Sequence, residues 1–116
     1  MEYTKLGSTG LDVSRLCLGC MNFGSERDWM LNDTDASVSL IHEAVDAGIN
    51  FLDTANVYSR GESEEIVGEA LASHDRSKLV VATKVYGEMH DGPNGSGLSR
   101  KHVIDQCEAS LDRLGT

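Results

Sequence analysis

The 116-residue chain lacks several features, and each absence excludes a class of protein. No apolar run approaches the roughly 18 residues that a membrane-spanning helix needs. The first ten residues have neither the basic nor the apolar region of a secretory signal. Three cysteines, Cys17, Cys20 and Cys107, form an odd set without the spacing of a disulfide framework. Such a set is typical of a reduced protein, so we expect a cytoplasmic location.

Basic residues are also scarce. Ten Lys and Arg against nineteen Asp and Glu leave a formal net charge of −9. Nucleic-acid backbones and anionic membranes both attract clustered Lys and Arg, so we expect neither as a partner. The composition, 40% hydrophobic and 25% charged, is that of a globular chain. Its length corresponds to one small domain.

The chain does contain an alternation of short apolar runs and amphipathic segments. Residues 3–6 and 11–16 flank the turn sequence "GSTG" and predict a β-hairpin. Three further strands are predicted within residues 15–20, 49–53 and 78–85. The last of these is continuously apolar up to its lysine, as expected for a strand that is covered on both faces.

A helix is predicted after each of these three strands. The first covers residues 34–47, with Asp33 or Thr34 at its start and Gly48 just beyond its end. The second covers residues 63–72, and the third begins after Ser99. The apolar faces predicted for the three helices are, in chain order, Leu40, Ile41, Ala44 and Val45; Ile66, Val67, Ala70 and Leu71; and Val103, Ile104, Cys107 and Leu111.

Alternating strand–helix units of about 30 residues imply parallel strands with right-handed crossovers. An open doubly wound sheet and part of a (β/α)₈ barrel both fit this order. The turn after the first strand, "LGCMNFG", has no G-x-G-x-x-G and no Walker lysine, so the familiar phosphate loops are absent. We therefore predict an α/β fold: a partial (β/α)₈ TIM barrel with an N-terminal hairpin and the first three βα units. Because a whole barrel has about 250 residues, residues 1–116 are expected to be the N-terminal part of one barrel domain.

Three reactive side chains lie at or near the carboxyl ends of predicted strands, where barrels place their active sites: Asp53 ends the second strand, Tyr58 lies in the loop after it, and Lys84 lies near the end of the third. Taken singly, Asp53 is more often a turn or cap residue, and Tyr58 a packed loop residue. Lys84 is different, because a lysine in a buried strand needs a partner, and Asp53 stands at a similar height on the neighbouring strand. A lysine held in this way beside Tyr58 would stabilise the phenolate. The phenol could then act as general acid or base while a cofactor delivers hydride to a carbonyl carbon.

Other candidate sites are weaker. Cys17 and Cys20 form a C-x-x-C motif, but Cys17 lies within a predicted strand, so the two side chains should point to opposite faces. Trp29 either lines a substrate pocket or covers the barrel rim, with packing slightly favoured. No metal site is expected, because the remaining candidates do not share ligand spacing on one element: His90, Asp91 and His102.

The segment "GINFLDTANVYSRGESEEIVGEAL" resembles the aldo-keto reductase signature. The matching positions are Gly48, Asp53, Thr54, Ala55, Tyr58, Glu65 and Gly68. "LGSTGLDVSRLCLGCMNFG" resembles the opening hairpin and first strand of that family, and "VVATKV" resembles its lysine strand. The similarity covers essentially the whole chain.

This resemblance implies a (β/α)₈ barrel that reduces a small-molecule aldehyde or ketone with NADPH. Tyr58 would be the general acid, Lys84 would tune it, and Asp53 would hold Lys84. The cofactor-binding positions near the nicotinamide would be Gly19, Cys20, Met21 and Asp53, and the first three would make contact through their backbone.

The family's fourth catalytic residue, a histidine on the fourth strand, and its adenine and phosphate site come after the point where this chain ends. None of the four histidines present follows a strand in the required place: His42, His74, His90 and His102. We therefore expect the 116-residue polypeptide alone to bind NADPH poorly and to lack turnover. Exposed strand edges and apolar faces should make it self-associate. The alternative is a non-enzymatic truncated product, or a barrel-like binding subunit.

Overall fold

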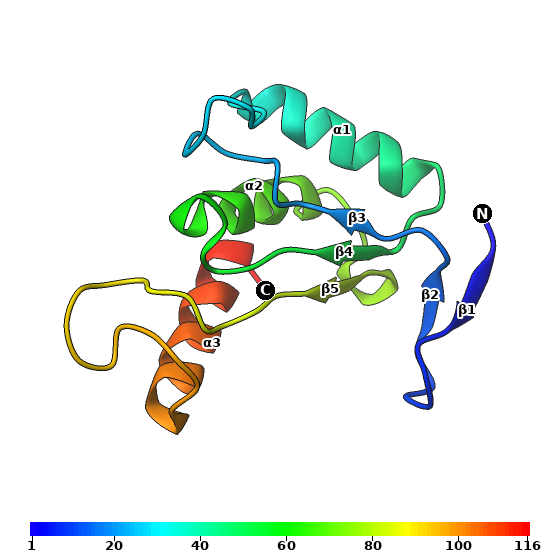
Figure 1. Cartoon of the computed structure of the whole chain (residues 1–116). Helices are drawn as coiled ribbons and strands as arrows, with labels where there is room; N and C mark the ends of the chain where they lie inside the picture. The colour runs from blue at the N-terminus through cyan, green and yellow to red at the C-terminus, as the bar shows by residue number, and fades with distance from the viewer.

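A parallel three-stranded sheet lies at the centre of the computed structural model, which describes all residues 1–116 (Figure 1). In spatial order the strands are β3 (Leu18–Gly19), β4 (Phe51–Asp53) and β5 (Val80–Ala82). The register aligns Leu18 with Leu52 and Leu52 with Val81. Because side chains alternate along a strand, these three residues share the face that packs on the helices. The predicted parallel order is confirmed.

The predicted antiparallel hairpin is also present, formed by β1 (Tyr3–Lys5) and β2 (Asp12–Ser14). Asn50, one residue before β4, fastens it to the sheet. The Asn50 side-chain oxygen accepts a hydrogen bond from the Ser14 N–H at 2.7 Å, and its amide donates to the Asp12 carbonyl at 3.0 Å. One polar side chain thus joins the hairpin to the amino end of β4.

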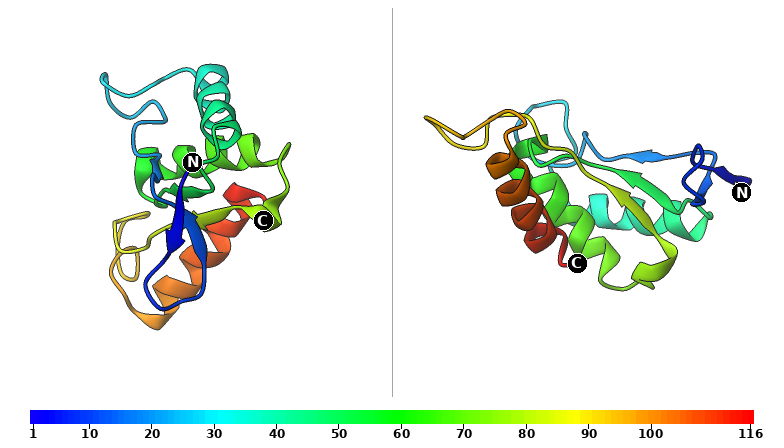
Figure 2. Two further views of the ribbon diagram at one scale, coloured as in Figure 1. Left: turned by 90° about the vertical axis from the view of Figure 1, so that its right-hand side faces the viewer. Right: turned by 90° about the horizontal axis from the view of Figure 1, so that it is seen from below.

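Three helices lie on one side of the sheet, and its other face is bare (Figure 2). The elements are α1 (Thr34–Asp46), α2 (Glu62–Leu71) and α3 (Arg100–Leu114), with short 3₁₀ turns η1 (Tyr58–Gly61) and η2 (Arg76–Lys78). Helix α2 lies in the middle, with α1 packed on one side of it and α3 on the other. None of the three α-helices combines the length and the apolar composition that a membrane span requires.

Capping residues determine where the helices begin. Asp33, not Thr34, caps α1, because its side chain accepts a hydrogen bond from the Ala36 N–H at 2.9 Å. Ser99 caps α3 in the same way, as predicted. Gly48 follows α1 with a φ of 97°, a conformation that a residue with a Cβ adopts only with strain.

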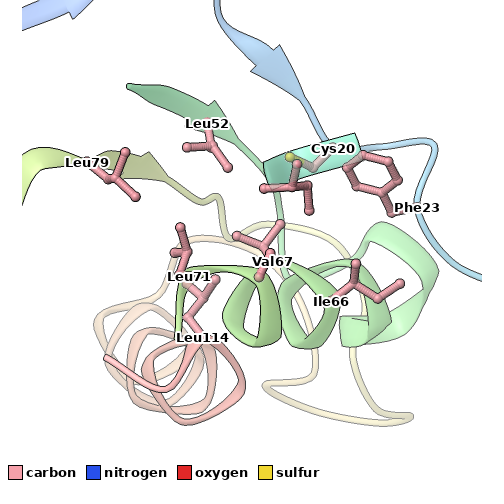
Figure 3. Packing of buried hydrophobic residues seen from close by; sticks show 10 residues of the cluster. Cys20, Phe23, Leu52, Ile66, Val67, Leu71, Leu79 and Leu114 are labelled. Atoms are coloured by element: carbon pink, nitrogen blue, oxygen red, sulfur yellow. The ribbon is translucent and has the colours of Figure 1, made fainter. Parts of the chain in front are cut away.

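The hydrophobic core fills the space between the sheet and α2 (Figure 3). Its ten buried members are Cys20, Phe23, Ile41, Leu52, Ile66, Val67, Ala70, Leu71, Leu79 and Leu114. The apolar face predicted for the second helix is therefore confirmed in full. Each large aliphatic side chain buried here stabilises the fold by about 1.5–3 kcal/mol.

The prediction for α1 is only partly right. Ile41 is fully buried and Ala44 and Val45 are partly buried, but Leu40 is 43% exposed. Helix α1 packs on α2 from the side, so only a narrow stripe of its surface is covered.

Helix α3 is present as predicted, but the apolar face predicted for it is wrong. The residues it buries are His102, Gln106, Ser110 and Leu114. The residues predicted to face inward are all exposed: Val103, Ile104, Cys107 and Leu111. The reason is that α3 packs beside α2 and contacts it largely through polar groups, so its apolar residues point away.

The strands are also less buried than predicted. Val80, Val81 and Ala82 are all only partly buried, and Leu16, in the segment predicted as the first strand, is 62% exposed. The partial burial of β5 follows from the helices lying on one side only, which leaves the second face of the sheet uncovered. Leu16 lies in a bend before β3 begins and is not part of the sheet. The expected self-association through such surfaces stays a prediction.

Candidate active site

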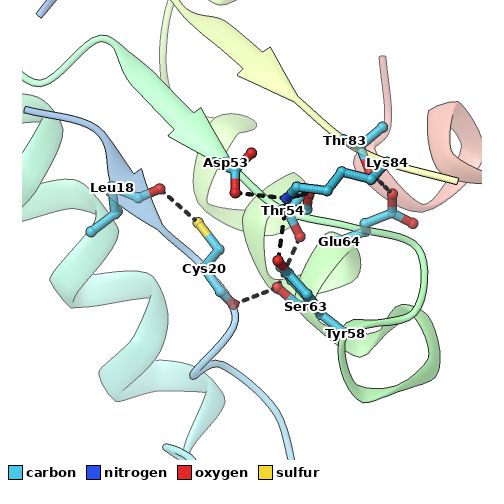
Figure 4. Close-up of polar contacts among 9 residues, drawn as sticks. All are labelled: Leu18, Cys20, Asp53, Thr54, Tyr58, Ser63, Glu64, Thr83 and Lys84. Atoms are coloured by element: carbon cyan, nitrogen blue, oxygen red, sulfur yellow. Dashed lines mark hydrogen bonds and ion pairs between the residues drawn. The ribbon is translucent and has the colours of Figure 1, made fainter. Parts of the chain in front are cut away.

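Three side chains meet at the carboxyl ends of the strands (Figure 4). Asp53 is the last residue of β4, Tyr58 opens η1, and Lys84 lies two residues beyond β5. The Lys84 ammonium donates to Asp53 Oδ2 at 2.7 Å, to the Thr54 carbonyl at 2.8 Å and to Tyr58 Oη at 3.2 Å. These bonds use all three ammonium hydrogens. The predicted pairing of Lys84 with Asp53 is therefore confirmed.

Backbone hydrogen bonds carry the sheet register past the strands to this cluster. The Thr54 N–H donates to the Ala82 carbonyl at 2.9 Å, and the Asn56 N–H donates to the Lys84 carbonyl at 3.3 Å. Asp53 is aligned with Ala82. Because Ala82 and Lys84 are two residues apart in extended chain, Lys84 points to the same bare face as Asp53.

The environment of Lys84 keeps it charged. Partial burial acts to lower its pKa, but hydrogen bonds to Asp53 and Tyr58 outweigh this, and the net effect is a raised pKa. Its Nζ also lies 4.9 Å from the centre of the Tyr58 ring. The Lys84 side chain is 49% exposed, so the argument that burial forces it to find a partner is wrong. The cluster itself nevertheless places a lasting positive charge at the tyrosine oxygen.

Two buried hydroxyls that were not predicted support the cluster. Ser63, in the first turn of α2, donates to the Cys20 carbonyl at 2.7 Å, and its Oγ lies 3.0 Å from Thr54 Oγ1. Because the Ser63 hydrogen is used, the Thr54 hydroxyl donates to Ser63. These contacts join the ends of β3 and β4 to α2. A serine at the polar start of a helix reads as a capping residue, so no sequence pattern distinguished it.

A pocket of about 380 Å³ opens beside Tyr58. Its lining is Met21, Glu26, Arg27, Trp29, Met30, Val57, Tyr58, Ser59 and Arg60. Trp29 is 61% exposed within it, so the pocket is favoured over the packing role. Ser59 and Arg60, directly after the tyrosine, have left-handed backbone with φ of 47° and 53°. Such strain in residues with a Cβ concentrates at functional sites.

The residues predicted to contact a cofactor differ in accessibility. Gly19 is aligned with Asp53, and no atom lies within 4 Å of the position that its Cβ would take. Met21 is 48% exposed. Cys20 is fully buried, its N–H donates to the Asp53 carbonyl at 2.8 Å, and its carbonyl accepts from Ser63. Open space therefore lies beside Gly19 and Asp53, and the binding roles of these residues stay predictions.

The two nearby thiols are held in the protonated form. Burial, followed by the charge of Asp53, raises the pKa of the exposed Cys17, and burial raises the pKa of Cys20 to about 12. Thiol chemistry needs the thiolate, so this environment disfavours a redox pair. The histidines considered for metal binding instead contact backbone oxygens: His90 bonds Asp91 and His102 bonds Asn94. No three His, Cys, Asp or Glu side chains converge as metal ligands would.

Comparisons with known proteins identify the family of the chain. The model of the aldo/keto reductase family matches residues 15–116. The versiconal hemiacetal acetate reductase of Aspergillus parasiticus is 42% identical, with 100% of this chain and 40% of that protein covered. A probable voltage-gated potassium channel subunit beta of Oryza sativa subsp. japonica is 41% identical, with 98% and 34% covered.

A solved structure extends the comparison to the fold. The holo form of an aldo-keto reductase from Bacillus halodurans matches with a TM-score of 0.85 at 34% identity, and covers 100% of this chain and 37% of that one. The fold therefore corresponds to part of a (β/α)₈ barrel, and the open doubly wound alternative is excluded. The chain spans 34–40% of the length of the curated relatives named above.

Proposed function

The chain belongs to the aldo/keto reductase family of oxidoreductases, and we propose that it carries the acid–base part of an NADPH-dependent carbonyl reductase site. One observation carries the proposal: a single ammonium group, that of Lys84, bonds both the Asp53 carboxylate and the Tyr58 hydroxyl. A lysine with a purely structural role would need only the ion pair with Asp53. A lysine that tunes a phenol needs the bond to Tyr58 as well.

The direction of these hydrogen bonds matters for the chemistry. Because Lys84 donates to Tyr58 Oη, the phenol keeps its own hydrogen free for a substrate carbonyl oxygen. Once Tyr58 gives up that proton, the ammonium at 3.2 Å stabilises the charge left on its oxygen. Asp53, at 2.7 Å, keeps Lys84 protonated and directed at the tyrosine. In the oxidation direction the same phenolate accepts the proton of an alcohol.

A nicotinamide cofactor, when bound, supplies the hydride. The residues present fit such a group, because Gly19 leaves open space beside Asp53, and Met21, two residues after Gly19, is exposed. We propose that these residues would hold the nicotinamide end. NADPH rather than NADH follows from the family resemblance alone.

The pocket beside Tyr58 supports a substrate with an apolar or aromatic body. Its volume, about 380 Å³, is within the range of small-molecule sites. Trp29, Met30 and Val57 provide apolar surface next to the tyrosine. We therefore propose an aldehyde or ketone whose carbonyl faces Tyr58 and whose body lies against the indole.

Replacement of the phenol tests the proposal. In the protein that contains this chain, Tyr58→Phe should lower the rate of NADPH oxidation with an aromatic aldehyde by about 10²–10⁴-fold. The substitution removes the hydroxyl that donates the proton and keeps the aromatic ring. Tyr86→Phe is the matched control, since Tyr86 is 70% exposed in the loop after β5, and it should leave the rate unchanged. A Tyr58→Phe protein that keeps the wild-type rate would refute the proposed role.

A barrel-like binding subunit is the second candidate, and the similarity to the plant channel subunit favours it. In that case the wild-type protein and the Tyr58→Phe variant should behave alike in the aldehyde assay. The same pair of proteins therefore separates the two functions.

A further inference from the structure

Glu64 is a buried charged side chain that the proposed chemistry does not use. It lies in the first turn of α2 and has no exposed surface. One carboxylate oxygen accepts a hydrogen bond from Thr83 Oγ1 at 2.5 Å, and the other pairs with Arg113 Nε at 2.6 Å. A buried carboxylate is costly unless its oxygens are satisfied, and here both are. Figure 4 shows Glu64 beside the cluster, joined to Thr83.

The two partners of Glu64 lead to the two reactive side chains. Thr83 is the neighbour of Lys84, and Arg113 packs against the turn that carries Tyr58. Thr83 directly precedes Lys84 in the chain. The Arg113 stem packs on Gly61, the last residue of η1: a Cβ on Gly61 would lie 2.7 Å from Arg113 Cδ. Glu64 therefore connects the strand end that bears the lysine with the turn that bears the tyrosine.

Thr83 can control the direction of its neighbour because of strand geometry. Consecutive side chains in extended chain point to opposite faces, so Thr83 points to α2 while Lys84 points to the bare face. Beyond β5 the ladder continues only through the 3.3 Å bond from the Asn56 N–H to the Lys84 carbonyl. The shorter bond from Thr83 to Glu64 anchors the opposite side of this strand end.

We propose that Glu64 is a positioning residue for the contact between Lys84 and Tyr58, and that it acts through Thr83 and through Arg113. The catalytic meaning of this role rests on the proposed function. The positioning itself is a property of the folded chain, and a measurement without turnover can detect it.

The test compares two substitutions at Thr83. Thr83→Val keeps the shape of the side chain but removes its hydroxyl, whereas Thr83→Ser keeps the hydroxyl. The readout is the titration of each unmodified lysine, followed by NMR of the ¹³Cε atoms of labelled lysine, because this keeps all three ammonium hydrogens of Lys84 in place. The assignment is simple because there are four lysines: Lys5, Lys78, Lys84 and Lys101. The charged or titratable groups that act on Lys84 are Asp53 and Tyr58, and neither of them is altered.

In Thr83→Val, Lys84 should titrate at a lower pH than in the wild type, because a misdirected ammonium loses contact with Asp53 and Tyr58. In Thr83→Ser it should titrate as in the wild type, and the other three lysines should not move in either variant. An unshifted Lys84 in folded Thr83→Val overturns the proposal. If that variant does not fold, Arg113→Lys decides, because it keeps the charge beside Glu64 but changes the stem on Gly61. The lysine signal that it adds is recognised by its absence from the wild type. Lys84 should again titrate at a lower pH, and an unshifted titration overturns the proposal.

This result is independent of the reductase assay. A downward shift of Lys84 in a protein without turnover supports the positioning role while the proposed function fails. Loss of turnover in Tyr58→Phe together with an unshifted Lys84 in Thr83→Val has the opposite meaning, and only the positioning role fails.

Discussion

Helices α2 and α3 pack side by side but bury opposite kinds of surface. Helix α2 lies under the sheet and buries an apolar stripe that includes Ile66, Val67 and Leu71. Helix α3 has only α2 and neighbouring loops to contact, and apart from Leu114 it buries polar side chains. Its own apolar residues Val103 and Ile104 are each 37% exposed. An apolar stripe thus marks the buried face of a helix only where an apolar partner covers it.

The polar interface of α3 is specific but incompletely paired. The Asn56 amide donates to Gln106 Oε1 at 3.1 Å, and Arg113 pairs with Glu64. Asn56 Oδ1 and His102 Nε2 are buried without a protein partner. An unsatisfied buried polar atom costs about 1–3 kcal/mol. Helix α3 is therefore held in place by a few specific hydrogen bonds and one ion pair, whereas α2 is held by the burial of many apolar atoms.

The largest expected effect comes from removing one partner of the buried ion pair between these helices. Arg113→Ala leaves the Glu64 carboxylate buried without its cation, and this should lower the free energy of unfolding by about 3–5 kcal/mol. Arg113 is only 19% exposed, so solvent cannot replace it well. Urea denaturation followed by circular dichroism measures the loss.

Arg100→Ala is the matched control, because Arg100 is exposed in the first turn of the same helix. It should change the free energy of unfolding by about 0.5 kcal/mol or less. Equal losses in the two variants would mean that the pair of Arg113 with Glu64 does not hold α3, and the contrast with α2 would collapse.

A second prediction concerns the distance between the two helices. A Cβ on Gly68 of α2 would lie 2.6 Å from the Arg113 carbonyl oxygen and 2.9 Å from Leu114 Cα. These are backbone atoms that cannot rotate away, so Gly68→Ala should push α3 outward at a cost of up to about 3 kcal/mol. The better helix propensity of alanine returns about 1 kcal/mol, which leaves a net loss of about 2 kcal/mol.

Glu69→Ala serves as the control, since Glu69 is exposed at the next position of α2. We expect it to leave the melting temperature within a degree or two of the wild type, on the order expected for a surface change. A Gly68→Ala protein as stable as this control would show that the close approach of the helices is dispensable.

Local patterns predicted the elements whose partners are also apolar. The spacing of Ile66, Val67, Ala70 and Leu71 identified the buried face of α2. Caps identified the starts of α1 and α3 because the capping bond lies within three residues in sequence. The cluster of Asp53, Lys84 and Tyr58 could be predicted because parallel strands bring their carboxyl ends to one edge.

Long-range polar contacts could not be predicted in this way. Gln106 and Asn56 are 50 residues apart, and Arg113 and Glu64 are 49 apart, so neither pair leaves a local pattern. The predicted burial of Lys84 was wrong for a related reason. Whether the second face of the sheet is covered depends on distant segments, and the apolar strand that precedes the lysine carries no information about them.

The smallest expected effect gives the most direct test of the contrast, because one substitution is made in both helices. Val67 in α2 is fully buried and Val103 in α3 is 37% exposed. Val67→Ala should cost about 1.5–2 kcal/mol, from two buried methyl equivalents at about 0.8 kcal/mol each. Val103→Ala should cost about 0.5 kcal/mol or less. Because both changes are Val to Ala within a helix, the difference in propensity cancels, and the ratio of the two losses reports burial alone. Comparable losses from parallel urea titrations would show that the outer face of α3 is covered in solution, for example by a second copy. A concentration dependence of the Val103→Ala loss would then identify that contact.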